Sequence, residues 1–237
     1  MNKTVKIIVE AVLAVAIVAL VYAIYSSIMQ PVNFNKEKAR RENVGIQRLK
    51  DIRTLQVAYK GVNNRFSPTV DSLKLFYETG EMAVVMQIGS SDDSLAWSHT
   101  EAVKKSLKFK GKPSATDVNN KLYELYQAGD KNLVFSVESK IPVKDTLFNN
   151  RPDFCIDSLK YIPYSGKQEV EMESDIRMVS GVPVPLFEAR MPYKALLKGL
   201  DNQLRINLDA ERRDQNKFEG LQVGSITAPN NNAGNWE

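Results

Sequence analysis

One uninterrupted apolar segment constrains this chain more than any other feature. From Ile7 to Met29 the sequence has no glycine or proline, and its only charged side chain is Glu10. A helix rises about 1.5 Å per residue, so this segment is long enough to cross the roughly 30 Å hydrocarbon core of a bilayer. In hydrocarbon an isolated segment satisfies its backbone hydrogen bonds only as a helix. We therefore predict one transmembrane helix over residues 7–29, preceded by a short cytoplasmic N-terminus over residues 1–6.

A cleaved signal peptide is the alternative interpretation of the same segment. Lys3 and Lys6 would supply its basic N-terminal region. The apolar run is longer than the about 7–15 residues usual for such a peptide. The small residues Ser26 and Ser27, followed by Ile28, are a poor match to a cleavage site. Both features favour an anchor that is retained.

Two features of the predicted membrane helix are typical of contact with a second helix. Glu10 places a carboxylate near the N-terminal end of the span, where it either extends to the interface or meets a partner. A ridge of small residues lies on a different helical face and would allow close approach, although alanine is common in any membrane helix. We predict partner contacts in the membrane at Glu10, Ala16, Ala19, Ala23 and Ser27.

Positive charge is concentrated just after this segment. The chain has a net charge of +4, and residues 36–65 hold nine basic and three acidic side chains. Attraction to anionic lipid headgroups fits this pattern, so membrane lipids are an expected partner. Nucleic acid is not, because no recognisable module or interleaved aromatic residues accompany the charge. Charge counting across the segment leans slightly toward a cytoplasmic C-terminus, but a short basic N-terminus before a long apolar run is typical of exported domains, and we predict export.

A second helix is predicted beyond the membrane. Pro31 should bend or end the first helix, and the segment from Lys36 to about Asn63 has helical periodicity. We therefore assign residues 30–66 to a juxtamembrane amphipathic helix. Its apolar stripe packs either on the chain's own domain or on a partner helix, and we designate it a helix interface formed by Leu49, Ile52, Leu55, Tyr59 and Val62.

The remaining residues, 67–237, predict an extracytoplasmic α+β domain. Apolar runs or alternation indicate strands over 82–88, 133–137 and 170–178, the last with a solvated acidic face. Prolines make 182–188 an edge-type or irregular strand. Helical patterns occur near 118–126 and 193–198, whereas alternation at 204–208 predicts a hairpin that returns over 218–226. The predicted fold class is thus α+β: a transmembrane helix, an amphipathic helix, and a mixed domain with a C-terminal antiparallel sheet.

The sequence contains no recognisable catalytic or metal-binding motif. Cys155 is the one cysteine and His99 the one histidine, which excludes an internal disulfide and a Cys/His zinc site. We expect Cys155, which follows an aromatic residue, to be a small buried hydrophobic side chain. No nucleophile motif or glycine-rich phosphate loop is present. We predict a non-enzymatic protein with no catalytic residue, no metal and no cofactor, and we keep an enzyme with an unrecognised site as an alternative.

The N-terminal third resembles type IV pilins and pseudopilins. Glu10 is fifth from Lys6 in an apolar helix, and the segments 49–59 and 64–73 look like the end of a pseudopilin spine and the turn that follows. Val5 stands where that family has the glycine used in processing. The resemblance implies a helix that assembles with other subunits.

A second resemblance covers more of the chain. The segments 33–38, 52–60, 182–189 and 223–236 look like a family of single-pass envelope proteins from the Bacteroidota. This resemblance implies a bacterial envelope. Together with the predicted export, it leads us to expect the anchor in the inner membrane and the C-terminal domain in the periplasm. We predict a structural subunit of a pilus-like, secretion or motility apparatus, in contact with other membrane-anchored subunits or with copies of itself. A stand-alone periplasmic binding module is the alternative.

Overall fold

A single long helix, α1, dominates the computed structural model, which describes residues 3–109 and 111–237. Residues 1 and 2 of the predicted cytoplasmic N-terminus lie outside the described residues. Helix α1 spans Lys3–Asn63, 61 residues, and includes Pro31 in its interior. Helix α1 therefore does not end at Pro31, which was one of the two outcomes expected there, and the segment from residue 30 onward continues the same helix. Proline removes one backbone hydrogen bond, and extension of an already formed helix is cooperative enough to continue past it.

The chain divides into two compact units, which are described separately. The first unit takes residues up to 60 together with 64–73 and 155–237, and the second takes 61–63 and 74–154. In the first unit, α1 becomes buried from Phe34 onward. Gly45 allows the helix to approach closely, since a Cβ atom there would lie 2.8 Å from the side chain of Leu221.

The first unit contains a three-stranded antiparallel sheet. Its order is β3 (Glu171–Val179), β4 (Val182–Pro192) and β5 (Gly220–Gly224). Strand β5 pairs only with residues 188–192 of β4, so the first residues of β4 pair with β3 alone. The predicted edge character thus holds for 182–187, the part that contains Pro183 and Pro185. Farther along, β4 is the central strand.

Helix α7 (Asn202–Asp214) replaces the first strand of the predicted hairpin. That prediction is wrong because the alternation at 204–208 coincides with stronger helical signals. The Asp201 carboxylate caps the helix by accepting a hydrogen bond from the Leu204 backbone N–H at 2.9 Å. Arg205 then forms an ion pair with Asp209 one turn later. The short helix α6 (Tyr193–Leu196) confirms the helix expected at 193–198.

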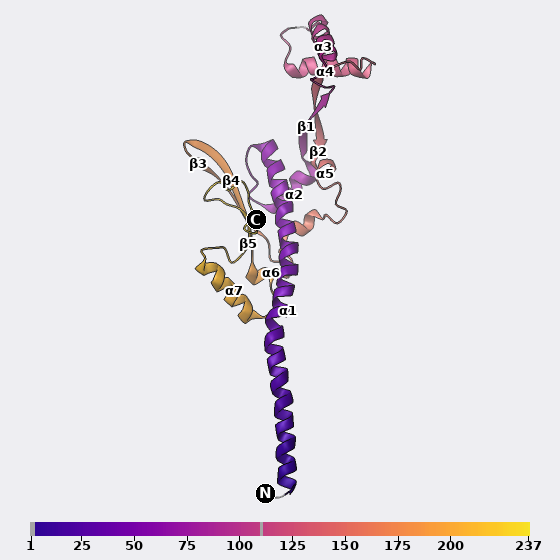
Figure 1. The fold of residues 1–237 in the computed structure, drawn as a ribbon. Helices are drawn as coiled ribbons and strands as arrows, with labels where there is room; N and C mark the ends of the chain where they lie inside the picture. The colour runs from indigo at the N-terminus through magenta and orange to yellow at the C-terminus, as the bar shows by residue number, and fades with distance from the viewer. Residues whose placement is uncertain (1–2, 110) are drawn as a thin grey trace. The chain divides into compact units, whose positions relative to one another are not determined.

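The second unit is built on a two-stranded antiparallel ladder. Helix α2 (Val70–Thr79) leads into β1 (Glu81–Ile88), which pairs with β2 (Phe135–Pro142). Between these strands come α3 (Ser94–Ser106) and α4 (Ala115–Gln127), which lie at one end of the ladder, and α5 (Val143–Thr146) follows it (Figure 1). The core of this unit is formed by Ile88, Leu122, Leu133, Phe135 and Val137.

Candidate functional site

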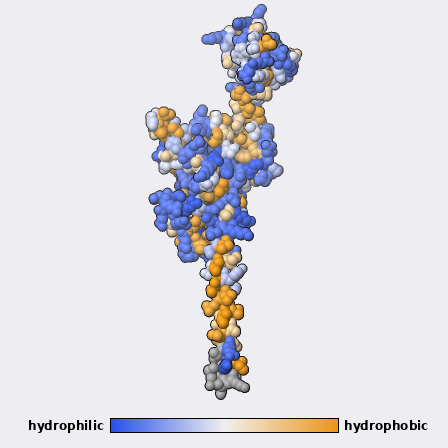
Figure 2. Space-filling view, in the orientation of Figure 1, coloured by the Kyte–Doolittle hydropathy of each residue, from blue (hydrophilic) through white to orange (hydrophobic). Residues whose placement is uncertain are grey.

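The N-terminal half of α1 is an uncovered apolar surface. Every residue from 10 to 28 is exposed, and none of the most apolar window is buried against the rest of the chain. Figure 2 shows this apolar helix extending from the polar part of the first unit. Leaving one large apolar side chain in water forgoes roughly 1.5–3 kcal/mol, so a surface of this size requires lipid or protein around it. By length and composition, α1 is able to cross a membrane.

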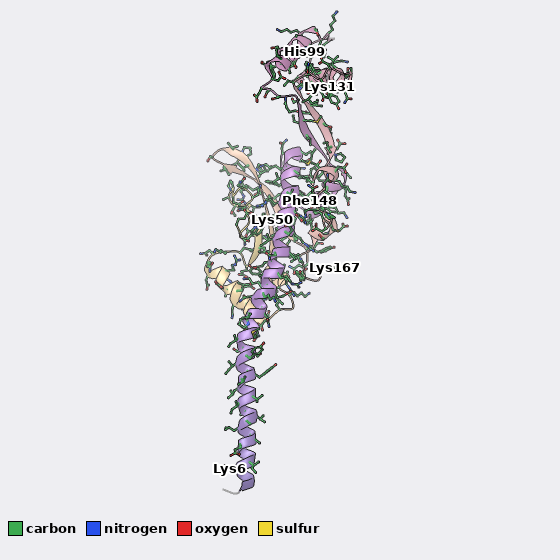
Figure 3. All side chains as sticks on the ribbon, turned by 45° about the vertical axis from the view of Figure 1, so that its right-hand side comes forward. Lys6, Lys50, His99, Lys131, Phe148 and Lys167 are labelled. Carbon is green, nitrogen blue, oxygen red and sulfur yellow. The ribbon has the colours of Figure 1, made fainter. Side chains whose placement is uncertain are left out.

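The predicted partner-contact residues all lie on this surface. Ala16, Ala19, Ala23 and Ser27 are exposed, so no other described part of the chain occupies the small-residue ridge. The carboxylate of Glu10 lies 3.9 Å from the ammonium group of Lys6, one helical turn earlier. Both side chains are about two-thirds exposed, at 65% and 66%. Figure 3 places Lys6 near the start of α1 and Lys50 on its packed half.

The predicted helix interface lies in a different environment. Leu49, Ile52 and Leu55 have no exposed surface, because they are buried in the chain's own first unit. Tyr59 is partly buried and Val62 is 45% exposed. Of the two alternatives kept for this stripe, packing on the chain's own domain therefore holds for Leu49, Ile52 and Leu55, which a partner could not reach without unfolding the unit.

Two buried polar networks fix the packed half of α1. Gln56 is fully buried and exchanges two hydrogen bonds with the backbone of Ser67. The buried Tyr193 hydroxyl donates to Glu42 at 2.5 Å and accepts from Arg212 at 2.9 Å. Burial, and then the hydrogen bond to Glu42, raises the pKa of Tyr193. The partners are far apart in sequence, so no local pattern indicates them.

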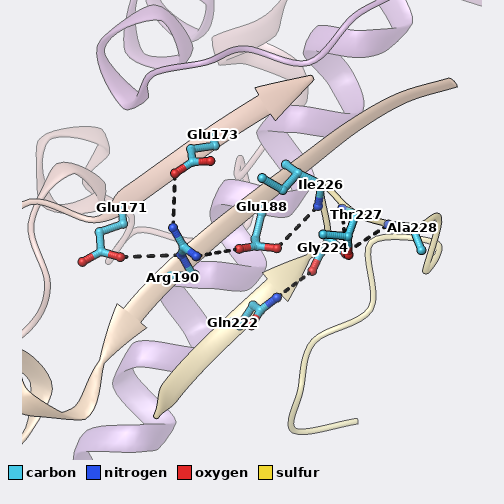
Figure 4. A network of polar contacts seen from close by, with 10 residues as sticks. Glu171, Glu173, Glu188, Arg190, Gln222, Gly224, Ile226, Thr227 and Ala228 are labelled. Carbon is cyan, nitrogen blue, oxygen red and sulfur yellow. Dashed lines mark hydrogen bonds and ion pairs between the residues drawn. The ribbon is translucent and has the colours of Figure 1, made fainter. Parts of the chain in front are cut away.

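The acidic strand predicted to face solvent is partly neutralised. Arg190 lies 3.5 Å from Glu171, 3.2 Å from Glu173 and 3.1 Å from Glu188 (Figure 4). Glu188 is almost buried and also accepts a hydrogen bond from the Ile226 backbone N–H at 3.4 Å. One guanidinium therefore organises three carboxylates across the β3–β4 pair. Among the described residues no group of three or more His, Cys, Asp or Glu side chains is placed to hold a metal ion.

The thiol and the imidazole belong to different units. Cys155 is exposed in the first unit, so the expectation that it is a buried hydrophobic side chain is wrong. His99, in the second unit, hydrogen-bonds to Asp130 at 2.8 Å. Both the Cys155 thiol and the His99 imidazole are thus side chains at the protein surface.

Comparisons of the chain with family models, with curated proteins and with solved structures found no match. The structure defines the chain as an α+β protein with antiparallel sheets and one N-terminal helix that is long and apolar enough to span a membrane.

Proposed function

We propose that the chain is a non-enzymatic, membrane-anchored structural subunit of a bacterial envelope assembly, such as a pilus-like, secretion or motility apparatus. The observation that carries the proposal is the division of α1 into two surfaces. Its first half is uncovered and presents a ridge of small residues, whereas its second half is a core element of the first unit. Such a helix fixes the folded unit directly to whatever binds the ridge in the membrane.

The proposed orientation puts the anchor in the inner membrane and both folded units in the periplasm. The exposed Cys155 is the only cysteine, so the native chain carries its own reporter. After the outer membrane is permeabilised, a membrane-impermeant maleimide is expected to label Cys155 in otherwise intact cells. Cys155→Ser is the unlabelled control. Labelling that requires rupture of the inner membrane would place the units in the cytoplasm and contradict this orientation.

The ridge is tested by enlarging it. Ala19→Leu combined with Ala23→Leu should reduce co-purification of other membrane subunits, or of a second tagged copy, by about tenfold, because small residues permit close helix contact. Ala11→Leu with Val18→Leu also enlarges two side chains, but on a helical face away from both the ridge and Glu10. That control should leave co-purification unchanged. If both double variants co-purify the same amount of partner subunits, assembly through the ridge is contradicted.

A stand-alone periplasmic binding module is the second candidate. The observation that favours it is the burial of Leu49, Ile52 and Leu55, which removes most of the predicted extramembrane contact. On this alternative, the chain would purify alone from mild detergent, and both double variants would behave like the native protein.

A further inference from the structure

A cationic pocket opens where α6 and α7 meet the rest of the first unit. Its volume is about 420 Å³, within the roughly 300–1,000 Å³ range of small-ligand sites. The pocket, termed the basal pocket, is lined by three cationic residues, by three polar residues and by Leu197, Gly199 and Leu200. The cationic residues are Lys194, Lys198 and Arg205, and the polar residues are Ser165, Gln168 and Asn202.

The two lysines carry charge that the fold does not neutralise. Among the described residues, no carboxylate lies within 4.0 Å of either ammonium group, whereas Arg205 forms an ion pair with Asp209. Lys198 donates to the neutral carbonyl of Ser165 at 3.1 Å. Both lysine side chains belong to exposed residues. No carboxylate lines the basal pocket, so its electrostatic preference is for an anion.

The position of the basal pocket narrows the class of anion. The Gln30 side-chain amide donates to the Asp201 carboxylate at 2.5 Å. Gln30 follows the last residue of the predicted membrane span, and Asp201 lies between two residues that line the pocket, Leu200 and Asn202. The pocket is therefore located where α1 leaves its apolar half. If that half spans a bilayer, lipid headgroups lie at this level.

We propose that the basal pocket binds the phosphate group of an anionic phospholipid. This inference rests on the membrane anchoring proposed above. Lysine ammonium groups act as point charges toward phosphate oxygens, and the side-chain amide of Asn202 adds a hydrogen-bond donor. A zwitterionic phosphatidylcholine headgroup would bring its own cation toward the two unpaired lysines. The pocket should therefore select an anionic headgroup such as phosphatidylglycerol.

The test measures binding directly, with the full chain in a neutral detergent. Short-chain dioctanoyl phosphatidylglycerol, dioctanoyl phosphatidylcholine and inorganic phosphate are titrated separately and followed by native mass spectrometry. We expect one saturable site for phosphatidylglycerol, with binding about tenfold tighter than that of phosphatidylcholine, because each lysine adds to the attraction of a negative headgroup. Inorganic phosphate should bind more weakly than phosphatidylglycerol. Equal affinity for inorganic phosphate would overturn the lipid assignment in favour of a soluble phosphate ligand.

Matched variants identify the residues that bind phosphatidylglycerol. Lys194→Gln with Lys198→Gln should weaken phosphatidylglycerol binding about tenfold or more, since two headgroup-directed charges are lost. Lys105→Gln with Lys140→Gln removes the same charge from exposed positions in the second unit and should leave binding unchanged. Lys194→Arg with Lys198→Arg should retain phosphatidylglycerol binding, because the positive charge is kept. This variant separates loss of charge from an effect of substitution on folding. Loss of binding in the second-unit control, or no saturable binding by the native chain, would overturn the proposal.

This measurement is independent of cellular topology and of co-purifying subunits. Failure of lipid binding therefore leaves the labelling of Cys155 and the ridge experiment interpretable. Conversely, a chain that binds phosphatidylglycerol through the basal pocket but purifies without partners would remain lipid-binding and contradict the assembly role alone.

Discussion

Replacing Leu55 by alanine is expected to lower the free energy of unfolding of the first unit by about 2–5 kcal/mol. Leu55 lies on the packed half of α1 and has no exposed surface. Its truncation removes buried methyl groups and leaves a cavity that a well-packed core fills only in part. The measurement is urea unfolding of the full chain in detergent, followed by tryptophan fluorescence. Trp97→Phe provides the background, so that Trp236 reports on the first unit alone.

Val57→Ala is the matched control, because Val57 belongs to the same part of α1 and is 52% exposed. Its effect should stay within about 0.5 kcal/mol, as for most surface substitutions. The comparison separates the two roles considered for the apolar stripe. A stripe reserved for a partner would give Leu55→Ala an effect as small as that of Val57→Ala in the isolated chain, which would contradict the internal packing.

The apolar stripe shows how far helical periodicity predicts structure. Leu49, Ile52 and Leu55 recur at helical spacing, so the helix and its buried face follow from the sequence. What covers that face does not follow, because a partner helix and the chain's own sheet both require the same pattern. One turn before this stripe, Gly45 is approached by Leu196 and Leu221, which come from distant segments of the chain.

Two strand predictions based on alternating apolar residues differ from the structure. Alternation at 204–208 is compatible with a strand, but the cap at Asp201 and the Arg205–Asp209 pair stabilise a helix. In β3, alternation predicted a half-buried strand, yet Ile176 and Met178 are 57% and 67% exposed. Alternation identifies the two faces of a strand and leaves open how far along the strand the packed core extends.

The two candidate sites differ in how far the sequence predicts them. The apolar helix surface is a property of consecutive residues, so the sequence predicts it directly. The basal pocket combines Ser165 and Gln168 with residues near 200, and its position depends on a contact between Gln30 and Asp201. Those two residues are 171 positions apart. Only the folded chain brings them together.

Gln56→Leu is expected to destabilise the first unit about as much as Leu55→Ala does, but through the loss of hydrogen bonds and not of core packing. The Gln56 amide donates to the Ser67 carbonyl at 2.8 Å, and its oxygen accepts from the Ser67 backbone N–H at 2.8 Å. Both residues are fully buried. Leucine fills a comparable volume but leaves two buried backbone groups unpaired, at about 1–3 kcal/mol each, so we expect a loss of about 2–6 kcal/mol in the same unfolding experiment.

Two further variants separate the hydrogen bonds from general effects of the substitution. Gln203→Leu makes the same change at an exposed position of α7 and should cost no more than about 0.5 kcal/mol. Gln56→Glu keeps an acceptor for the Ser67 N–H but buries a carboxylate, which raises the pKa of the new side chain. The folded variant then binds a proton more tightly than the unfolded chain, so its stability should fall as the pH rises above about 4.3, the usual pKa of glutamate. When protonated, the glutamic acid again donates to the Ser67 carbonyl, and stability should approach that of the native chain. A Gln56→Glu variant with the same pH dependence as the native chain would show that this buried bridge does not hold the turn after α1.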